Sequence, residues 1–287
     1  METPGVSAFD HVDAVIFDID GTLIHAKDPS GAKGARPIPG AIEAVERVRA
    51  SGRPILFFTN GTGRPPARAA ADLRSVGFAL ADEEYMNPAV VAAGWIARKH
   101  PGRSVLVLGG EGVVAPLLER GISVMKAADA RIADVVLVGW DDTLTYGELW
   151  AACDSVWAGA PLLATSTASV FSVDGGPAPG WSGAVVAGIR HTTGARAVTL
   201  GKPSPVALRE MCRVLGVPPT RTAVVGDDLD LEIAMARRLG SPTALVLSGI
   251  SSDTDARASR HTPTVILPDV SSFPALLSSD WSPRPDS

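Results

Sequence analysis

Two aspartates one residue apart follow a short apolar run near the N-terminus. The run Val15-Ile16-Phe17 is expected to form a strand that leads into Asp18 and Asp20. Because residues i and i+2 of an extended chain point to the same side, both carboxyl groups can share one pocket at the carboxyl end of the strand. One can act as a nucleophile and the other as a proton donor. Their mutual repulsion would be relieved by a hard cation with oxygen ligands, and Mg²⁺ is the common choice.

Three more groups of polar residues follow apolar runs that resemble strands. Thr59-Asn60-Gly61 follows the second run, Lys202 lies in a Gly-Lys-Pro turn before a helix, and Asp227 opens an acidic run that reaches Glu232. Each group alone has a structural explanation, namely a polar turn, a surface lysine or acidic residues that complement a helix N-terminus. If the strands are parallel, however, their carboxyl ends meet at one edge of the sheet, so all four groups can form one pocket.

The chemistry that suits these residue types is phosphoryl transfer, because a phosphoryl group carries spread negative charge that needs electrostatic stabilisation. The carboxylates of Asp18 and Asp227 and the backbone carbonyl of Asp20 are expected to hold Mg²⁺. Lys202 is expected to offset the charges of the nucleophile and of the phosphate. The sequence therefore predicts one site in which a metal ion and a lysine both face the attacking carboxylate.

Phosphate binding is expected to depend on local groups, since the net charge of the chain is −5. The Thr59 hydroxyl, the N–H groups around Asn60 and Gly61, and Lys202 are the predicted phosphate-binding groups. Lys and Arg are scattered along the chain and form no basic run, so a nucleic-acid partner is not expected. The expected partner is a small phosphorylated metabolite.

Length and composition predict a packed protein with more than one domain. The chain has 287 residues, of which 46% are apolar and 20% charged, and a second module besides one core is the natural expectation at this length. Cys153 and Cys212 belong to no metal-binding or redox motif, so two buried reduced thiols are expected. No signal peptide and no membrane-spanning run is evident, which predicts a cytoplasmic protein without a membrane partner.

Short β-branched runs alternate with helical patterns along the chain, which indicates parallel βαβ units. The predicted strands are Ala14–Phe17, Pro54–Thr59, Ser104–Leu108, Val135–Val138, Leu162–Thr165, Ala197–Leu200, Thr222–Val225, Ala244–Leu247 and Thr264–Leu267. The predicted helices are Ala41–Ala50, Pro66–Val76, Ala89–Lys99, Val113–Arg120, Tyr146–Ala158, Pro205–Leu215 and Leu231–Leu239. A long loop, Gly21–Pro39, is expected to border the site.

Taken together, these motifs resemble those of the haloacid dehalogenase (HAD) superfamily phosphatases. The resemblance extends from Val12 to about Leu267 and is strongest to class IIA, the group of NagD, 4-nitrophenylphosphatases and phosphoglycolate or pyridoxal phosphatases. The segments that carry it are Asp18-Ile19-Asp20-Gly21-Thr22, Pro39-Gly40-Ala41, Thr59-Asn60-Gly61, Leu108-Gly109-Gly110-Glu111-Gly112, Val138-Gly139-Trp140-Asp141, Ala164-Thr165-Ser166, Pro179-Gly180, Gly201-Lys202-Pro203-Ser204-Pro205 and the Gly-Asp cluster at 226–232.

The resemblance implies a doubly wound, mostly parallel α/β core with an inserted smaller α/β cap. Residues 1–100 and 195–287 would form the core, with a disordered tail from about 278, and residues 101–194 would form the cap. The cap would close over the pocket, exclude water and choose the substrate. Relatives often dimerise through the cap, which implies a homodimer.

The implied reaction is hydrolysis of a small phosphomonoester in two steps. Asp18 attacks phosphorus to form an aspartyl-phosphate, and Asp20 protonates the leaving oxygen and then accepts a proton from the attacking water. Sugar phosphates, phosphoglycolate-like acids, nucleotides and cofactor phosphates all remain candidate substrates. Two alternatives remain: phosphoryl transfer to an acceptor other than water, and a phosphometabolite-binding protein without turnover.

Three positions depart from the family pattern. Glu232 stands where the second aspartate of the fourth motif is usual, so it is expected to reach the metal through a water. Asp228, a further candidate ligand, or Asp230 is expected to take part of this role. The Gly21–Pro39 loop is longer than in typical relatives. Ser166 follows the cap's Ala-Thr, where Asn or Asp is frequent.

Two further features of the sequence have structural interpretations. Gly109-Gly110-Glu111-Gly112 lacks the spacing of a nucleotide-binding loop, so a turn of the cap is expected. Trp140 and Trp181 are expected to pack in the interior of the cap.

Overall fold

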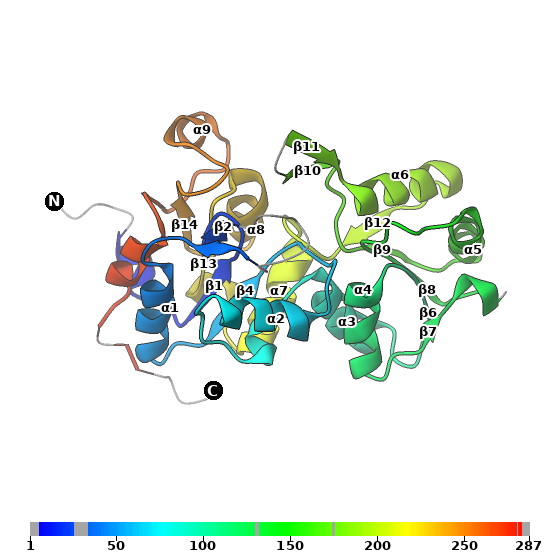
Figure 1. Ribbon diagram of the computed structural model, residues 1–287, viewed down its shortest axis with the longest axis horizontal. Helices are drawn as coiled ribbons and strands as arrows, with labels where there is room; N and C mark the ends of the chain where they lie inside the picture. Colours follow the sequence, from blue (N-terminus) through cyan, green and yellow to red (C-terminus); the bar gives the residue numbers. More distant parts are fainter. Residues whose placement is uncertain (1–5, 26–33, 130–131, 174–175, 280, 283–287) are drawn as a thin grey trace.

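The computed structural model describes residues 6–25, 34–129, 132–173, 176–279, 281 and 282. Two α/β bodies lie side by side, each built around a parallel sheet (Figure 1). The larger sheet takes its strands from both ends of the sequence, and the smaller sheet takes its strands from the middle. The predicted fold class, a mostly parallel α/β core with a smaller α/β insertion, is confirmed.

The larger sheet has six parallel strands in the order β15-β14-β13-β1-β4-β5. Their bounds are β1 Ala14–Asp18, β4 Ile55–Phe58, β5 Tyr85–Met86, β13 Thr222–Gly226, β14 Thr243–Val246 and β15 Val265–Leu267. All residues of β1, β4 and β13 are buried, as expected for strands covered on both faces. The chain leaves β1 for β4 on one side and later returns to β13 on the other, so β1 marks the point where the strand order reverses. Ligands bind at such a point in open α/β sheets.

Alternate residues of these strands enter two different hydrophobic clusters. Phe17 and Phe57 pack on the face covered by α1 (Ala41–Ala50) and α2 (Pro66–Ser75). The opposite face carries Ile16 and packs against α3, α7 and α8, whose bounds are Pro88–Lys99, Pro205–Leu215 and Ala234–Arg237. This alternation with a period of two makes the sheet doubly wound.

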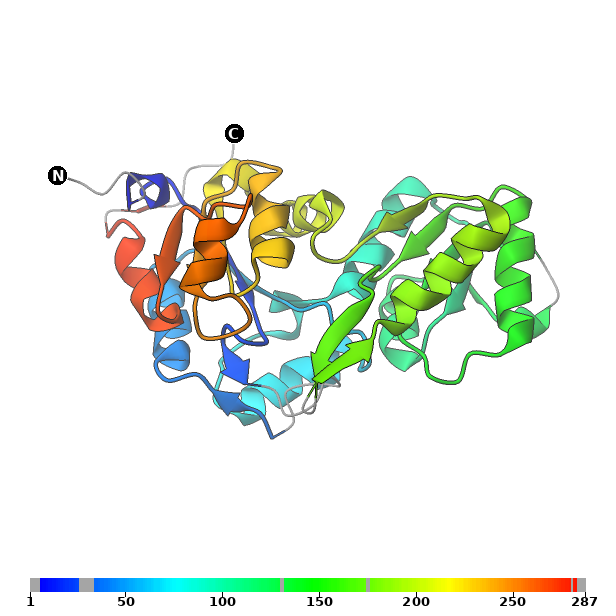
Figure 2. The same cartoon turned by 90° about the horizontal axis from the view of Figure 1, so that it is seen from above.

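The smaller sheet has five parallel strands in the order β12-β9-β8-β6-β7. Their bounds are β6 Val105–Leu108, β7 Val124–Met125, β8 Val135–Val138, β9 Leu162–Ala164 and β12 Ala197–Thr199, and the helices are α4 Glu111–Glu119, α5 Tyr146–Trp157 and α6 Trp181–Thr193. A hairpin, β10 (Val170–Val173) with β11 (Gly176–Pro179), extends from the smaller body towards the larger one (Figure 2).

The two bodies share one apolar cluster. Ile16 of the larger sheet and Leu137 of the smaller sheet belong to the same buried group, and Ile96 of α3 lies within it. At the first turn of α4, a Cβ on Gly112 would lie 2.3 Å from the carbonyl oxygen of Thr62, so the smaller body also contacts the loop after β4 closely. The bodies are therefore packed against each other through α3 and α4.

Most predicted elements are present, with bounds that differ by one or two residues, but four predictions need correction. The strand at Ala197–Leu200 pairs with β9, so it belongs to the smaller sheet and the expected boundary at 194/195 falls too early. The helix α6 was not predicted. The expected helix Leu231–Leu239 is a π-helical turn, Leu229–Ile233, followed by α8. Trp140 is 36% exposed and does not lie in the interior.

The Gly21–Pro39 segment contains a short antiparallel pair, β2 (Ile24–His25) with β3 (Arg36–Pro37), and its residues 26–33 lie outside the described part. A last short helix, α9, spans Asp253–Ala258. Within the described residues, no helix combines the length and the apolar character needed to cross a bilayer.

The described part of the C-terminal tail packs against the larger body. Trp281 Nε1 donates a hydrogen bond to Asp13 Oδ1 at 2.8 Å, and the Arg53 guanidinium lies 4.9 Å from the centre of the Trp281 ring. Arg53 also donates to the Ser278 carbonyl at 3.0 Å. The expected disordered tail from about 278 is therefore corrected for these residues, while 280 and 283–287 lie outside the described part.

Candidate active site

The predicted site residues lie at the carboxyl ends of three neighbouring strands. Asp18, the last residue of β1, is in register with Phe58, the last residue of β4. On the other side of β1, Phe17 is in register with Val225, two residues before Asp227. The strand register therefore brings three of the four predicted motifs to one edge of the larger sheet.

Lys202 brings the fourth motif to the same place. Its ammonium forms an ion pair with Asp18 Oδ1 and lies 2.5 Å from Glu232 Oε1 and 3.4 Å from the Phe58 carbonyl oxygen. Burial by itself would lower the pKa of Lys202, but the charges of Asp18 and Glu232 outweigh it and raise the pKa. The lysine is therefore a permanent positive charge held against the Asp18 carboxylate.

Asp20 lies at the exposed side of the site, next to Thr59. The Thr59 hydroxyl donates to Asp20 Oδ2 at 3.1 Å and accepts a hydrogen bond from the Gly61 N–H at 3.1 Å. Although Asp20 is solvent-exposed, desolvation by the surrounding protein and repulsion from Asp18 raise its pKa to about 6. A carboxyl group with such a pKa can both donate and accept a proton near neutral pH.

Asp227 is 2% exposed and is enclosed by main chain. Its Oδ2 accepts a hydrogen bond from the Ile250 N–H at 2.8 Å. A Cβ on Gly21 or Gly249 would lie 2.3 Å or 1.9 Å from that oxygen, so both positions exclude a side chain. Burial, followed by repulsion from Asp18 and Glu232, raises the pKa of Asp227 to about 8.

Glu232 and Asp228 have roles that the sequence did not predict. Both oxygens of Glu232 have protein partners: Oε1 meets Lys202, and Oε2 accepts the Asp228 N–H at 3.1 Å. Asp228 Oδ1 accepts the N–H groups of Asp230 and Leu231 at 2.7 Å and 3.3 Å, which caps the π-helical turn. In this structure Glu232 is therefore a partner of Lys202, and Asp228 is a cap.

Asn60 also has a different environment from the predicted one. Its side-chain amide accepts the Lys202 N–H at 2.8 Å and donates to the Lys202 carbonyl at 3.1 Å. Asn60 was expected only to help hold phosphate. The Gly61 N–H donates to the Thr59 hydroxyl, and the Gly61 carbonyl accepts a hydrogen bond from the buried Asn87 at 3.2 Å.

Several residues at the site were not identified from the sequence. Ser248-Gly249-Ile250-Ser251 follows β14 and surrounds Asp227, and the Ser251 N–H donates to the Asp227 carbonyl at 3.0 Å. The sequence contains a signal for this turn, because a polar segment with a glycine follows an apolar strand here, as one does after β1, β4 and β13. That turn lacks a charged residue, which is why it was overlooked.

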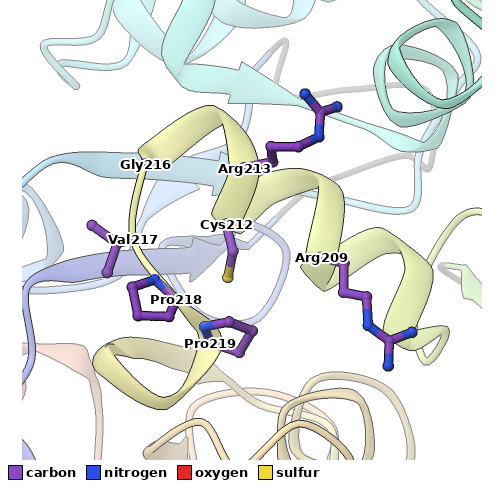
Figure 3. A pocket seen from close by; sticks show the side chains of 7 residues that line it. All are labelled: Arg209, Cys212, Arg213, Gly216, Val217, Pro218 and Pro219. Carbon is purple, nitrogen blue, oxygen red and sulfur yellow. The ribbon is translucent and has the colours of Figure 1, made fainter. Parts of the chain in front are cut away.

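A pocket of about 350 Å³ lies apart from the site around Asp18 (Figure 3). It is formed by the end of α7 and the turn that leads into β13, so it lies at the amino end of that strand. None of the predicted site residues lines it. Its lining residues are Arg209, Cys212, Arg213, Gly216, Val217, Pro218 and Pro219.

Comparison with known proteins agrees with this geometry. Residues 15–123 match a family model described as haloacid dehalogenase-like hydrolase, and residues 199–273 match a HAD-hydrolase-like model. Chronophin of Rattus norvegicus is 33% identical over 254 residues, which cover 85% of this chain and 79% of chronophin.

Two solved structures are similar over nearly the whole chain. NagD from E. coli K-12 is 26% identical with a TM-score of 0.79, covering 91% of this chain and 97% of NagD. Glycerol phosphate phosphatase Rv1692 from Mycobacterium tuberculosis, solved in complex with magnesium, is 29% identical with a TM-score of 0.79, covering 93% of this chain and 77% of that one. The chain belongs to the haloacid dehalogenase-like hydrolases and is a phosphatase of their class IIA.

Proposed function

We propose that this phosphatase hydrolyses small phosphomonoesters with Mg²⁺ through an aspartyl-phosphate formed on Asp18. The observation that carries the proposal is the buried contact between the Lys202 ammonium and the Asp18 carboxylate at the sheet edge. Lys202 follows Asp18 by 184 residues, so only the fold brings them together. A cation that lies against a carboxylate, with a second carboxyl group nearby, suits a nucleophile that must approach an anionic phosphate.

The residues around Asp18 fit a magnesium ion. Asp18 Oδ2 is buried and has no hydrogen-bond partner among the described residues. A buried carboxylate oxygen without such a partner is suited to bind a cation. No three His, Cys, Asp or Glu side chains in the described part are arranged to hold a metal. The proposed ligands are accordingly two side chains, Asp18 and Asp227, and the backbone carbonyl of Asp20. A bound magnesium ion would neutralise charge on the carboxylates and the phosphate.

In the first step, one Asp18 oxygen forms a bond to phosphorus while the bond from phosphorus to the leaving oxygen breaks. Asp20 gives its proton to that oxygen, which leaves as an alcohol. Lys202 holds its charge beside the reacting centre throughout. The Thr59 hydroxyl and the Gly61 N–H, which donate here to Asp20 and to Thr59, are the proposed donors to the phosphoryl oxygens.

In the second step, Asp20 accepts a proton from a water molecule, whose oxygen bonds to phosphorus as the bond to Asp18 breaks. Inorganic phosphate leaves, and both aspartates return to their starting states. A pKa of about 6 suits Asp20 for this exchange, because both of its protonation states are accessible near neutral pH.

The proposal is tested with p-nitrophenyl phosphate in the presence of Mg²⁺ or EDTA. Turnover that requires Mg²⁺, together with a hydroxylamine-sensitive phosphate on the acid-quenched protein, is the expected result. Tight binding of phosphate esters without turnover would contradict it. Added alcohols should not capture the phosphoryl group; if they do in preference to water, the protein is a phosphotransferase.

The substrate class can then be measured by phosphate release from a panel of metabolites. Glycerol phosphate belongs in it because the similar Rv1692 is named a glycerol phosphate phosphatase. Sugar phosphates, phosphoglycolate, pyridoxal phosphate and nucleotides complete the panel. Localisation in the cytoplasm and a homodimer remain parts of the proposal, and the second is tested by sedimentation.

Without metal, the stability of the protein should fall as pH rises from about 5 to about 8. Burial raises the pKa of Asp227 to about 8 and that of Glu232 to about 7, whereas carboxyl groups of an unfolded chain titrate near 4. The folded state therefore binds more protons in this window, and its stabilisation is lost as pH rises through the raised pKa values. Thermal unfolding in EDTA at both pH values measures the change.

The control for this prediction is Asp227→Asn, which removes one of the raised carboxyl pKa values and should reduce the dependence. Mg²⁺ should stabilise the wild-type protein most at the higher pH, where both proposed carboxylate ligands are ionised. The exposed Asp134 and Asp255 have lowered pKa values and act only under more acidic conditions. A melting temperature that stays constant or rises with pH would contradict the prediction.

Gly249→Ala should weaken magnesium binding by about tenfold or more, the range found for residues that support metal ligands. Its Cβ would lie 1.9 Å from Asp227 Oδ2, so the carboxylate must move. The Mg²⁺ concentration for half-maximal activity measures the effect. Gly188→Ala on α6 is the matched control, because its Cβ would meet nothing within 4 Å. Equal magnesium dependence in both variants would show that Asp227 is not a ligand.

A further inference from the structure

The side-chain amide of Asn60 pairs with the main chain of Lys202 as one peptide group pairs with another. Asn60 Oδ1 accepts the Lys202 N–H at 2.8 Å, and Asn60 Nδ2 donates to the Lys202 carbonyl at 3.1 Å. The two residues are 142 positions apart. Two hydrogen bonds to one residue fix both its position and its orientation, as a single bond would not. We call this pair of hydrogen bonds the amide clamp.

Among the described residues, the clamp links the Lys202 main chain by hydrogen bonds to the segment that follows β4. On the other sides, the Leu200 N–H donates to the Ala164 carbonyl at 2.8 Å in the smaller body, and the Ser204 N–H donates to the Gly201 carbonyl at 2.9 Å at the start of α7. Those two contacts tie the segment to the smaller body and to a helix. The clamp ties it to the larger sheet, whose strands carry Asp18.

The neighbouring glycine makes the clamp possible. A Cβ on Gly201 would lie 2.6 Å from Asn60 Oδ1, 2.4 Å from the Thr165 carbonyl oxygen and 2.8 Å from Pro88 Cγ. A side chain at this position would therefore push the amide of Asn60 away from Lys202. The absence of a side chain at Gly201 therefore leaves room for the amide of Asn60, and a turn on the surface would not need such a fit.

The position of the Lys202 main chain matters because its side chain has four rotatable bonds and a buried end. Lys202 is 5% exposed, and its ammonium must meet Asp18, Glu232 and the Phe58 carbonyl at once. If the main chain shifted, the ammonium would lose part of this set of contacts. A displacement of about 1 Å at a reacting centre can cost about 10²-fold in rate.

We propose that Asn60 is a positioning residue that acts on catalysis through Lys202, rather than through contact between its side chain and the phosphate. The inference rests on the proposed function for its kinetic consequence and on the clamp alone for its structural one. Removal of the clamp should lower kcat and leave KM nearly unchanged, because the ammonium is displaced while the other proposed phosphate donors, the Thr59 hydroxyl and the Gly61 N–H, keep their positions.

The kinetic test compares Asn60→Ala and Asn60→Asp with the wild-type protein. In Asn60→Ala, kcat should fall by about 10- to 100-fold and KM should change by less than about twofold. Asn60→Asp keeps the volume and one acceptor but places a carboxylate oxygen opposite the Lys202 carbonyl, so its kcat should fall at least as far. An increase of KM with unchanged kcat in either variant would overturn the proposal, because it would indicate direct binding of substrate.

A double-mutant cycle tests whether the effect passes through Lys202. In a Lys202→Arg background, Asn60→Ala should add less than about twofold to the loss of kcat. If Asn60→Ala keeps its full effect there, the proposal is wrong. Thr145→Ala in the capping box of α5 is the control for a general loss of hydrogen bonds, since it removes the cap at Glu148 N–H far from the site. It should leave kcat within about twofold.

A second measurement does not depend on turnover. Acetic anhydride labels lysine amines, and mass spectrometry follows Lys202 alone. The buried ammonium should react severalfold faster in Asn60→Ala and Asn60→Asp than in the wild-type protein or Thr145→Ala. If labelling of Lys202 is unchanged, the clamp does not position it, whatever the kinetics. If labelling increases but no variant, including the wild type, turns over, the proposed function fails and the clamp stands.

Discussion

Asp18→Asn should lower kcat for p-nitrophenyl phosphate by at least about 10⁴-fold and leave the fold intact. An amide is a very poor nucleophile towards phosphorus, and loss of a covalent nucleophile costs about 10⁴- to 10⁶-fold in other hydrolases. Asp18 is 4% exposed at the end of β1, where asparagine has nearly the same volume. Lys202 keeps its contact with Glu232 in this variant, so a buried cation is not left alone.

The control is the same chemical change at Asp269, the N-cap residue of a distant short helix, Val270–Leu276. Asp269 Oδ1 accepts the Ser271 N–H at 2.9 Å, and an asparagine amide oxygen can accept it equally. Asp269→Asn should retain wild-type kcat. The two variants should also have similar circular dichroism spectra. Residual turnover in Asp18→Asn within about 100-fold of the wild type would contradict covalent catalysis by Asp18.

The convergence of the site was predictable because it depends on the order of strands and on little else. Asp18 ends a buried apolar strand, Thr59 and Asp227 each follow one, and parallel strands present such positions at one edge. Lys202 was predictable as a site residue from its motif. It follows a strand of the smaller sheet, however, and reaches the site by way of the turn before α7.

The roles of side chains within the site were less predictable, because they depend on alternatives that have the same sequence pattern. Glu232 was expected near a metal, but its extra methylene lets it reach Lys202 while its second oxygen accepts the Asp228 N–H. Asp228 was expected only as a candidate metal ligand within an acidic run, and in the structure it caps the π-helical turn. Asn60 pairs with a main chain 142 residues away, which no local pattern indicates.

The helices that escaped prediction have weak local signals. The helix α6 contains Gly183 and Gly188, which lower helix propensity, and it ends in two β-branched threonines. Its amphipathic contact with the smaller sheet, through Val186 and Ile189, stabilises it in spite of these residues. The π-helical turn at Leu229–Ile233 places Glu232 towards Lys202, so tertiary contacts again override local preference.

The shared apolar cluster also changes the expectation for the cap. The resemblance implied a cap that closes over the pocket, and such a movement is easiest when the cap has few contacts with the core. Here Ile96 of α3 lies in a cluster that includes both sheets, and Gly112 of α4 lies against the Thr62 carbonyl. Opening at this side would expose buried apolar surface, which costs free energy in proportion to the area. Substrate access is therefore expected from the side opposite α3 and α4.

Lys202→Ala should reduce the free energy of unfolding by about 3–5 kcal/mol at a pH of about 8, the cost of removing one partner from a buried ion pair. Asp18 and Glu232 would then face each other without the cation, and their side chains are only 5% and 2% exposed. Catalysis should be lost as well, since the positive charge that Lys202 holds against the nucleophile would be gone. Urea unfolding of the metal-free protein measures the first effect.

The loss of stability should be smaller at a pH of about 5, and this separates electrostatics from packing. Without Lys202 the pKa of Glu232, already raised to about 7 by burial, should rise further, so the folded state retains a proton that the unfolded chain loses near 4. Stability is then highest at low pH and falls as pH rises through the raised pKa. A cavity left by the lysine stem would instead cost the same at both pH values.

Adding Glu232→Gln to Lys202→Ala should restore a large part of the stability at the higher pH and none of the activity. The neutral amide removes one of the two negative charges that repel each other, and its oxygen can still accept a hydrogen bond from the Asp228 N–H. This result would assign Glu232 to the charge balance of Lys202. If the double variant is as unstable as Lys202→Ala at both pH values, the two carboxylates are not coupled through the lysine, and Glu232 stabilises the site by packing alone.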